Sequence, residues 1–303
     1  MSCPSFPGCA VAPVELPSIV GTAPREEGYL LFECPKPWPK KIKKIEGLPQ
    51  ALRKVLKRYK EIDFKLVAAP SFPWPSEGSG PRALILRWKD GTTVCKEVEA
   101  TPDAVTAGLS DPDWGEPREL FLVCTHGSRD SCCGLKGVPI YQNLVAKGSR
   151  AVLQASHLGG HRFAPVIAAF PEWRFFGHLS PQESLEMAEC LDNNKPYLKG
   201  YRGNGRLDKR LQAVEAKLWE KYGDELFSVE ELSGNKEFLK VRATLRGGQA
   251  HIFSATLKYF VYHAYKSCKD FRKEKMSELK LPLVEELQEC ALDEEPSLTP
   301  SHQ

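Results

Sequence analysis

Residues 120–133 read LFLVCTHGSRDSCC, and residues 151–162 read AVLQASHLGGHR. Each stretch opens with a short apolar run that is typical of a buried strand, and each run leads into side chains that bind metals or react as thiols. In open α/β sheets, ligand sites gather beyond the carboxyl ends of the strands. The two stretches therefore predict a layered α/β fold with candidate site residues at two strand ends.

The sequence around these stretches predicts a thioredoxin-like order of elements. A helix over residues 138–147 follows the first stretch, with Pro139 in its first turn. Two strands between residues 163 and 179 follow the second stretch, and a capping box at residues 180–183 begins the next helix. The resulting order, β-α-β and then β-β-α, is that of a thioredoxin-like fold.

The rest of the chain predicts an α/β segment before this unit and a small α+β extension after it. Residues 1–113 read as a strand, a helix and three further strands, and the similar strand order of the two segments suggests duplication. Residues 204–303 read as an amphipathic helix, a hairpin, helical or irregular chain and an acidic tail. We therefore expect an α/β class with α+β additions and domains over residues 1–113, 114–203 and 204–303.

The composition is that of an ordinary globular protein, with 303 residues of which 42% are apolar and 27% charged. A net charge of +3 predicts neither a nucleic acid nor a membrane surface as a partner, and the basic run over residues 36–44 is expected to be a solvated face. No apolar run reaches the ~18 residues of a spanning helix, and the first residues do not resemble a secretory signal. Ten cysteines without such a signal indicate a reducing compartment, and an N-terminus poor in arginine favours the cytoplasm over the mitochondrial matrix.

Four side chains in the quoted stretches form a candidate metal site. Cys124 and Cys133 have the spacing C-x8-C, and His157 and His161 have the spacing H-x3-H. Gly159-Gly160 would destabilise a helix between the histidines by ~2 kcal/mol, so we expect a loop there instead of a zinc-protease helix. Two thiolates and two imidazoles suit a tetrahedral zinc ion and equally a [2Fe–2S] cluster. The wide cysteine spacing favours the larger inorganic core, but the residues alone leave both open.

The same residues resemble a known family. CTHGSRDSCCG at residues 124–134 and SHLGGHRFA at residues 156–164 are similar to the sucrase/ferredoxin-like family, and the similarity extends over residues 17–222. The resemblance implies a thioredoxin-like ferredoxin domain that holds a [2Fe–2S] cluster. Carried over to this sequence, the ligands are Cys124, Cys133, His157 and His161, with Cys132 as the neighbour that could replace Cys133.

Several neighbouring residues are candidates for tuning such a site. The polar side chains of the first loop could donate toward the thiolates and fix the loop, or they could only shape a turn. The glycine amides of the second loop can approach sulfur, and the arginine after it can offset charge or meet a partner. Scattered thiols such as Cys268 are expected to be buried and inert. The tuning candidates are His126, Arg129, Asp130, Cys132, Gly159, Gly160 and Arg162.

The function that the resemblance implies is electron transfer, not hydrolysis. Exchanging two thiolates for neutral imidazoles makes an oxidised cluster neutral, which in Rieske centres raises the potential from about −400 mV to between about −150 and +300 mV. We expect reduction to be coupled to a proton on an imidazole. The sequence does not identify the redox donor and acceptor, each a protein or a small redox-active molecule. Two other functions stay open: a zinc-stabilised binding module with the same four ligands, and a thiol oxidoreductase that uses Cys132 or Cys133.

Overall fold

The structure is a computed structural model that describes residues 18–45, 50–68 and 81–290, so the acidic tail after residue 290 lies outside the described residues. The strands are β1 Gly28–Glu33, β2 Ile62–Ala68, β3 Arg82–Lys89, β4 Thr92–Glu99, β5 Leu120–Cys124, β6 Ala151–Ala155, β7 Val166–Phe170, β8 Arg174–Gly177, β9 Tyr201–Asn204, β10 Leu226–Gly234, β11 Phe238–Leu245, β12 Ala250–Tyr265 and β13 Met276–Cys290. The helices are α1 Gln50–Arg58, α2 Pro102–Ser110, α3 Ser131–Lys147, α4 Pro181–Asp192, α5 Lys209–Tyr222 and α6 Cys268–Arg272.

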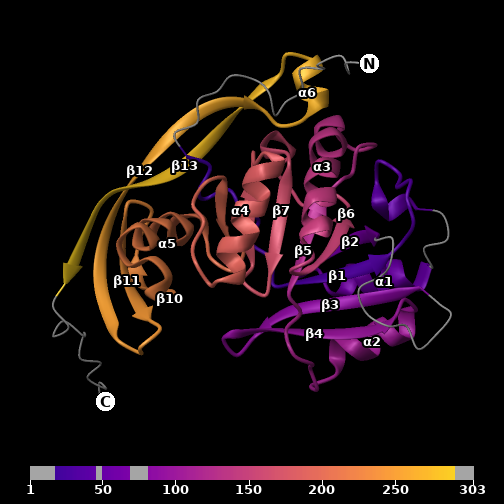
Figure 1. The fold of residues 1–303 in the computed structure, drawn as a ribbon, viewed down its shortest axis with the longest axis horizontal. Helices are drawn as coiled ribbons and strands as arrows, with labels where there is room; N and C mark the ends of the chain where they lie inside the picture. The colour runs from indigo at the N-terminus through magenta and orange to yellow at the C-terminus, as the bar shows by residue number, and fades with distance from the viewer. Residues whose placement is uncertain (1–17, 46–49, 69–80, 291–303) are drawn as a thin grey trace, which may run out of the picture.

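Two sheets organise these elements. The larger is mixed and nine-stranded, in the order β4-β3-β1-β2-β6-β5-β7-β8-β9, and the smaller is four-stranded and antiparallel, β10-β11-β12-β13 (Figure 1). This arrangement confirms the predicted α/β class with additions. None of the helices in the described ranges is both long and apolar enough to cross a membrane.

Eight of the nine strands of the larger sheet form two units with the same topology, and β9 adds to the edge of the second unit. Read outward from its middle, one half runs β2-β1-β3-β4 and the other β6-β5-β7-β8, and in each half the first two strands are parallel and the next two antiparallel. The halves meet where β2 pairs antiparallel with β6, so an approximate twofold rotation relates them. The second half has the predicted β-α-β, β-β-α order, and the duplication suggested by the sequence has a structural counterpart. The predicted boundary at residue 113 lies between two units of one sheet, and the division into three domains stays a prediction.

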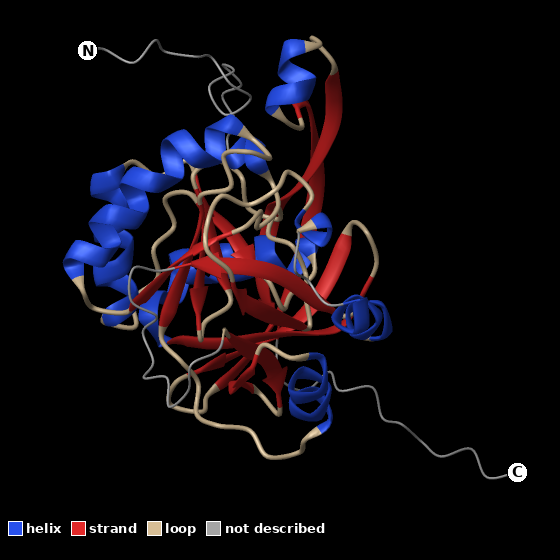
Figure 2. Cartoon of the chain, turned by 90° about the vertical axis from the view of Figure 1, so that its right-hand side faces the viewer, coloured by secondary structure: helices blue, strands red, loops and turns tan. Residues whose placement is uncertain are grey.

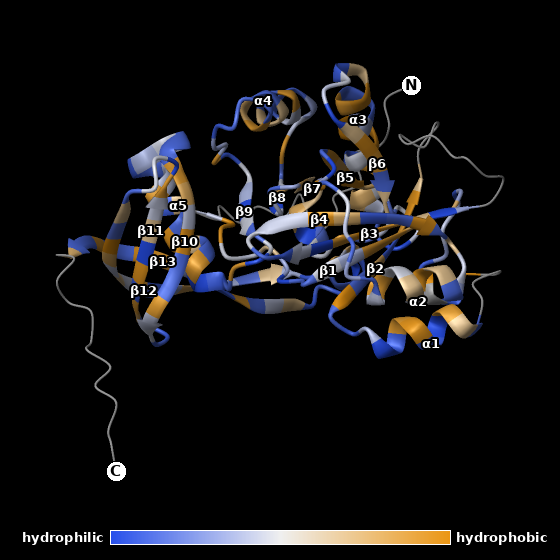
Figure 3. Ribbon diagram, turned by 90° about the horizontal axis from the view of Figure 1, so that it is seen from below, coloured by the Kyte–Doolittle hydropathy of each residue, from blue (hydrophilic) through white to orange (hydrophobic). Residues whose placement is uncertain are grey.

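The sheet curls so that its two halves pack face to face. Side chains alternate between the faces of a strand, so Leu30 points toward the core under α1 and α2 while Tyr29 points the other way. The Tyr29 ring lies 5.6 Å from Phe170 and 5.5 Å from Trp173, both in the second half. The Trp173 indole donates a hydrogen bond to Thr93 of β4 at 2.8 Å. The helices consequently lie outside, with α3 and α4 on one side and α1 and α2 on the other (Figure 3).

Helix α3 begins at Ser131, seven residues before the predicted start at residue 138, and Pro139 lies inside it instead of in its first turn. The predicted start was wrong because Gly134 and Gly137 lower the helix propensity of this turn. The tertiary structure nevertheless requires both glycines. A Cβ atom at Gly137 would lie 2.1 Å from the Cys124 carbonyl oxygen, and one at Gly134 would lie 2.9 Å from the Cα atom of Gly127. The close approach of α3 to β5 therefore decides where the helix starts.

Two further elements differ from the prediction. Helix α2 was not predicted, although Thr101 caps it and Pro102 occupies its first turn. Residues 276–290, predicted to be helical or irregular, form strand β13, which pairs with β12 along its whole length. Alternating charged residues such as those of β13 carry a weak strand signal, and the long partner strand supplies the hydrogen bonds.

Glu26 provides a pH-dependent test of the packing of the first unit. Burial, followed by the charge of Asp63, raises the pKa of the Glu26 carboxyl to about 7, although Lys65 opposes the shift. The folded state therefore binds a proton more tightly than the unfolded state, and stability falls as pH rises from about 4.5 to about 7. We expect Glu26→Gln to raise the free energy of unfolding at pH 8 by on the order of 1 kcal/mol, because the group is partly exposed, and to change nothing at pH 4.5. Thermal unfolding at both pH values measures this, with Glu27→Gln as the control.

Candidate metal centre

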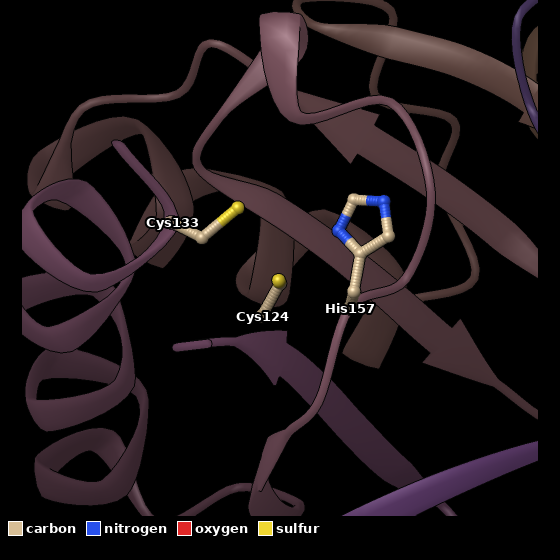
Figure 4. Close-up of side chains that lie close together, drawn as sticks. All are labelled: Cys124, Cys133 and His157. Atoms are coloured by element: carbon tan, nitrogen blue, oxygen red, sulfur yellow. The ribbon is translucent and has the colours of Figure 1, made fainter. Parts of the chain in front are cut away.

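Cys124 and Cys133 meet where β5 ends and α3 begins. Cys124 is the last residue of β5, and Cys133 lies in the first turn of α3, which Gly137 allows to approach the Cys124 carbonyl. Both thiols are fully buried. Their Sγ atoms and a ring nitrogen of His157 all lie within 4.8 Å of one another, and Figure 4 shows the three side chains turned toward a common space.

The two histidines project from a loop that follows β6. Gly159 and Gly160 adopt φ values of 86° and 71°, in the left-handed region that favours glycine, and a 3₁₀ turn begins at His161. The loop, predicted from these glycines, places the His157 and His161 rings in a stack with centroids 4.1 Å apart. Nδ1 of His157 is buried and has no hydrogen-bond partner among the described residues. A buried nitrogen without a partner is costly, and coordination would satisfy it.

Metal binding requires thiolates and neutral imidazoles; Cys124 and His161 are held in the required protonation state, whereas Cys133 has to lose its proton when a metal binds. The pKa of the Cys124 thiol lies well below its usual range because Cys133 donates a hydrogen bond to its sulfur, with burial opposing and His157 adding to the shift. The same hydrogen bond, reinforced by burial, raises the pKa of Cys133. Burial lowers the pKa of His161 to about 4, so its ring is neutral at neutral pH. The donor set therefore fits a thiophilic metal or an iron–sulfur cluster.

The His126 side chain, one of the candidates for donation to a thiolate, instead makes hydrogen bonds to the backbone around the site. Its Nε2 atom lies 3.1 Å from the Pro39 carbonyl and its Nδ1 atom accepts a hydrogen bond from the backbone N–H of His157 at 3.3 Å. Because both ring nitrogens are used in this way, the neutral ring has one preferred tautomer. Burial lowers the pKa of His126, which keeps the ring neutral. His126 thus positions His157.

The other tuning candidates of the first loop also make contacts that the sequence did not predict. Arg129 donates to the Lys40 carbonyl at 3.4 Å. The Asp130 carboxylate is buried and lies 3.8 Å from Nδ1 of His161. The Cys132 thiol lies 3.1 Å from the sulfur of Cys268, a residue far along the chain that was expected to be inert. Cys132 and Cys133 therefore face different groups.

Sequence reasoning missed the contribution of the first unit to this site. Trp38, inside the basic run, is buried and packs edge-on against the His126 ring at 5.8 Å. Lys36 donates to the carbonyl and hydroxyl oxygens of Thr125 at 3.3 and 3.2 Å. Lys36, Lys40 and Lys41 are exposed, as expected of a solvated face, whereas Trp38 is buried against the site. A tryptophan among lysines was the sequence feature that could have indicated this contact.

Sequence reasoning also missed Arg202, whose guanidinium is hydrogen-bonded to the backbone of the histidine loop. The fully buried guanidinium donates to the Gly159 carbonyl at 3.2 Å and to the carbonyl and hydroxyl oxygens of Thr22 at 2.5 and 3.1 Å. A Cβ atom at Gly160 would lie 2.6 Å from this guanidinium, which explains the second glycine. Burial lowers the pKa of Arg202 to about 9.

Replacing Arg202 with lysine is expected to lower the free energy of unfolding by about 2–3 kcal/mol, because an ammonium group cannot make the same set of hydrogen bonds. Backbone hydrogen exchange at residues 157–161 should become faster in the same variant. Thermal unfolding and exchange measured by mass spectrometry test the two effects. Arg210→Lys, which alters a partly exposed contact with Asp208 and Glu231, is the matched control and should cost less than about 1 kcal/mol.

Comparison with known proteins places this geometry in a family. A family model described as sucrase/ferredoxin-like matches residues 19–203, more than half of the 303 residues. Altered inheritance of mitochondria protein 32 of Meyerozyma guilliermondii is 30% identical over 99 residues, which cover 29% of this chain and 35% of that protein. The alignment thus spans about a third of that relative's length, and no solved structure matches the chain. The matched range contains both cysteines and both histidines of the site, and the chain belongs to the sucrase/ferredoxin-like family.

Proposed function

We propose that this protein is an electron carrier whose [2Fe–2S] cluster is held by Cys124, Cys133, His157 and His161. The observation that carries the proposal is the convergence of two buried thiols and one imidazole within 4.8 Å, with the second imidazole stacked on the first. When bound, such a cluster supplies a one-electron couple. The chain itself holds the ligands in a fixed geometry and excludes water from the two sulfur atoms.

The spacing of the four ligands is compatible with a two-iron core and with a single zinc ion. In a tetrahedral zinc site all ligand atoms lie about 3.3–3.8 Å apart, as follows from zinc–ligand bonds of about 2.0–2.3 Å. Among the described residues, the group of mutually close ligand atoms includes Cys124, Cys133 and His157 but not His161. The zinc-stabilised module remains the alternative to be tested.

A basic pocket beside the histidine loop supports an anionic or acidic redox partner. The pocket has a volume of about 460 Å³, and its lining includes the cationic Arg25, Arg162 and Lys209, which outnumber the acidic Asp208. Like charges around one opening raise the local concentration of an oppositely charged partner. The His161 side chain keeps 16% of its surface exposed, whereas the thiols are buried, so electrons would enter and leave on the histidine side.

Serine variants of the two adjacent cysteines test the ligand assignment. Cys133→Ser is expected to abolish visible absorption and to reduce bound iron at least tenfold, because a neutral hydroxyl is a poor ligand for iron. Cys132→Ser should keep both, because its thiol faces Cys268. Absorption spectra with iron and sulfide analysis measure the outcome. Loss of colour in Cys132→Ser alone would exchange the roles of the two residues.

Electron paramagnetic resonance of anaerobically purified, dithionite-reduced protein tests the cofactor itself. We expect a Rieske-type signal that changes in His157→Cys and His161→Cys variants. A colourless protein that contains one zinc ion per chain would favour the binding module. Disulfide reductase activity that disappears in Cys132→Ser while colour persists would favour the thiol oxidoreductase.

The compartment and the proton coupling stay predictions. The sequence predicts the cytoplasm, while the name of the relative refers to mitochondria, so cell fractionation is the appropriate test. Coupling to an imidazole proton predicts that the midpoint potential falls with rising alkaline pH. A potential that stays constant between about pH 6 and pH 10 would contradict it.

A further inference from the structure

A second group of reactive side chains lies beside the proposed cluster site and is not part of it. The sulfur atoms of Cys132 and Cys268 are 3.1 Å apart, and the Asp130 carboxylate lies with them in a group whose ligand atoms are within 4.8 Å of one another. All three side chains are buried. Cys268 lies outside residues 19–203, the range that the family model matches. The group thus joins the family domain to a part of the chain outside that range.

Cys268 stands at the end of a long arm. Strands β12 and β13 extend away from the small sheet as a two-stranded arm, and helix α6 forms its tip beside α3 (Figures 1 and 2). In the middle of the arm, the side chains of residues 259–261 are exposed. At the tip, Cys268 is buried, and Tyr265 and Phe271 pack against the core of the larger sheet. Farther from the tip, Leu279 also packs against this core and Leu281 is buried, so the tip is one of several contacts that dock the arm.

Asp130 orients the Cys268 thiol toward α3. Its carboxylate accepts a hydrogen bond from the backbone N–H of Cys268 at 2.9 Å and one from the Cys268 thiol at 2.6 Å. Asp130 immediately precedes α3, and Cys132 is the second residue of that helix. The contact therefore fixes the first residue of α6 directly over the first turn of α3.

We propose that Cys132 and Cys268 form a reversible disulfide that fastens the arm to α3. A disulfide bond is about 2.05 Å long, so the sulfur atoms must approach by about 1 Å. The oxidant is a small disulfide such as glutathione disulfide. One protein thiolate attacks it and releases one glutathione thiol, and the second protein thiol then displaces the other. Two protein S–H groups lose two electrons and two protons, which leave with two glutathione thiols.

The spacing within the group favours a disulfide over a metal ion. Ligand atoms around one tetrahedral zinc ion lie about 3.3–3.8 Å apart. The Cys132–Cys268 sulfur separation of 3.1 Å and the sulfur–oxygen separation of 2.6 Å between Cys268 and Asp130 are both shorter. A metal would have to push these atoms apart, whereas a disulfide requires them to move closer together.

The disulfide would form under oxidising conditions and would then restrain the helix turn that carries Cys133. Cys133 directly follows Cys132 in the first turn of α3, so a bond to the arm restrains the backbone of this proposed ligand. Both thiols of the pair are buried while the arm is docked, so exchange with glutathione requires the tip to lift. The inference does not depend on the proposed cluster, because Cys132 and Cys268 form a separate group.

Thiol trapping on the full-length protein tests the proposal. The protein as purified is equilibrated anaerobically with glutathione buffers of increasing disulfide fraction, quenched with acid, alkylated and digested. We expect mass spectrometry to detect a Cys132–Cys268 peptide that accumulates with the disulfide fraction and disappears with dithiothreitol, while the visible spectrum and iron content stay constant. Hydrogen exchange at residues 266–275 should slow about tenfold in the oxidised form, because cross-linking suppresses opening of the tip.

Variants and outcomes separate this disulfide from other chemistry. Cys268→Ser should eliminate the cross-link and the slower exchange, whereas Cys190→Ser, on the distant helix α4, should leave both unchanged. The proposal is overturned if Cys190 becomes glutathionylated while no Cys132–Cys268 peptide forms, if Cys132 pairs with Cys133 instead, or if the pair reacts only after a chelator has removed a metal. An iron-free protein that still forms the cross-link would refute the proposed cluster and retain the disulfide.

Discussion

Replacing Gly137 with alanine is expected to destabilise the protein by about 2–4 kcal/mol and to abolish most cofactor binding. Helix propensity alone predicts the opposite sign, because alanine is favoured over glycine inside a helix by ~1 kcal/mol. The added methyl group, however, would lie 2.1 Å from the Cys124 carbonyl oxygen, which belongs to the backbone of β5 and cannot rotate away. Helix α3 must therefore move away from β5, and it carries Cys133 with it.

Thermal unfolding and iron content measure the two effects of Gly137→Ala. We expect the midpoint temperature to fall by roughly 3–6 °C, as the size of the chain implies, and bound iron to fall at least fivefold. Gly247→Ala is the matched control, because a Cβ atom there has no neighbour within 4 Å. A Gly137→Ala protein as stable as the parent would show that α3 does not pack against β5 as closely as described.

Replacing His161 with cysteine is expected to lower the midpoint potential by ~125 mV or more, half of the smallest separation between Rieske centres and plant-type ferredoxins. A thiolate adds one negative charge to the cluster, and addition of an electron to a more negative cluster is less favourable. His161 is the ligand whose assignment depends most on this test, because it stands outside the closest group of three.

Dye-mediated redox titration of the purified variant measures the potential. His178→Cys is the control, because this residue belongs to the same unit but is not among the proposed ligands. An unchanged potential with an unchanged resonance signal in His161→Cys would remove this residue from the ligand set. The same titration of His157→Cys should give a shift of the same sign.

The sequence predicted those parts of the site in which chemistry and local conformation agree. Apolar runs ending in Cys124 and leading to His157 identified the two strands. Gly159 and Gly160 identified the histidine loop because two glycines disfavour a helix, and both adopt left-handed backbone in the structure. The predicted start of α3 was wrong because Gly137 has low helix propensity, although close packing of α3 against β5 requires a glycine there. No local pattern revealed that Arg202 supports the loop, since its partners lie 43 and 180 residues away.

The arm illustrates the same distinction at larger scale. Residues 276–290 have little strand character by themselves, and their conformation depends on pairing with β12. Cys268 looked like an isolated thiol in the sequence, yet the arm brings it 136 residues back to Cys132. Contacts over such separations leave no signal in short windows of sequence, because neither partner constrains the residues next to the other.

The sequence by itself determined the α/β class, the βαβ-ββα order, the family and the four candidate ligands, because strand patterning, glycine conformation and ligand chemistry are properties of short stretches. Only the tertiary structure decided that Cys133 and not Cys132 faces Cys124, that the two units share one curled sheet, and that Asp130 and Cys268 meet. Those outcomes depend on how closely α3, the first unit and the arm pack around the site. Packing between distant segments is determined by side-chain shape and burial and not by local sequence pattern.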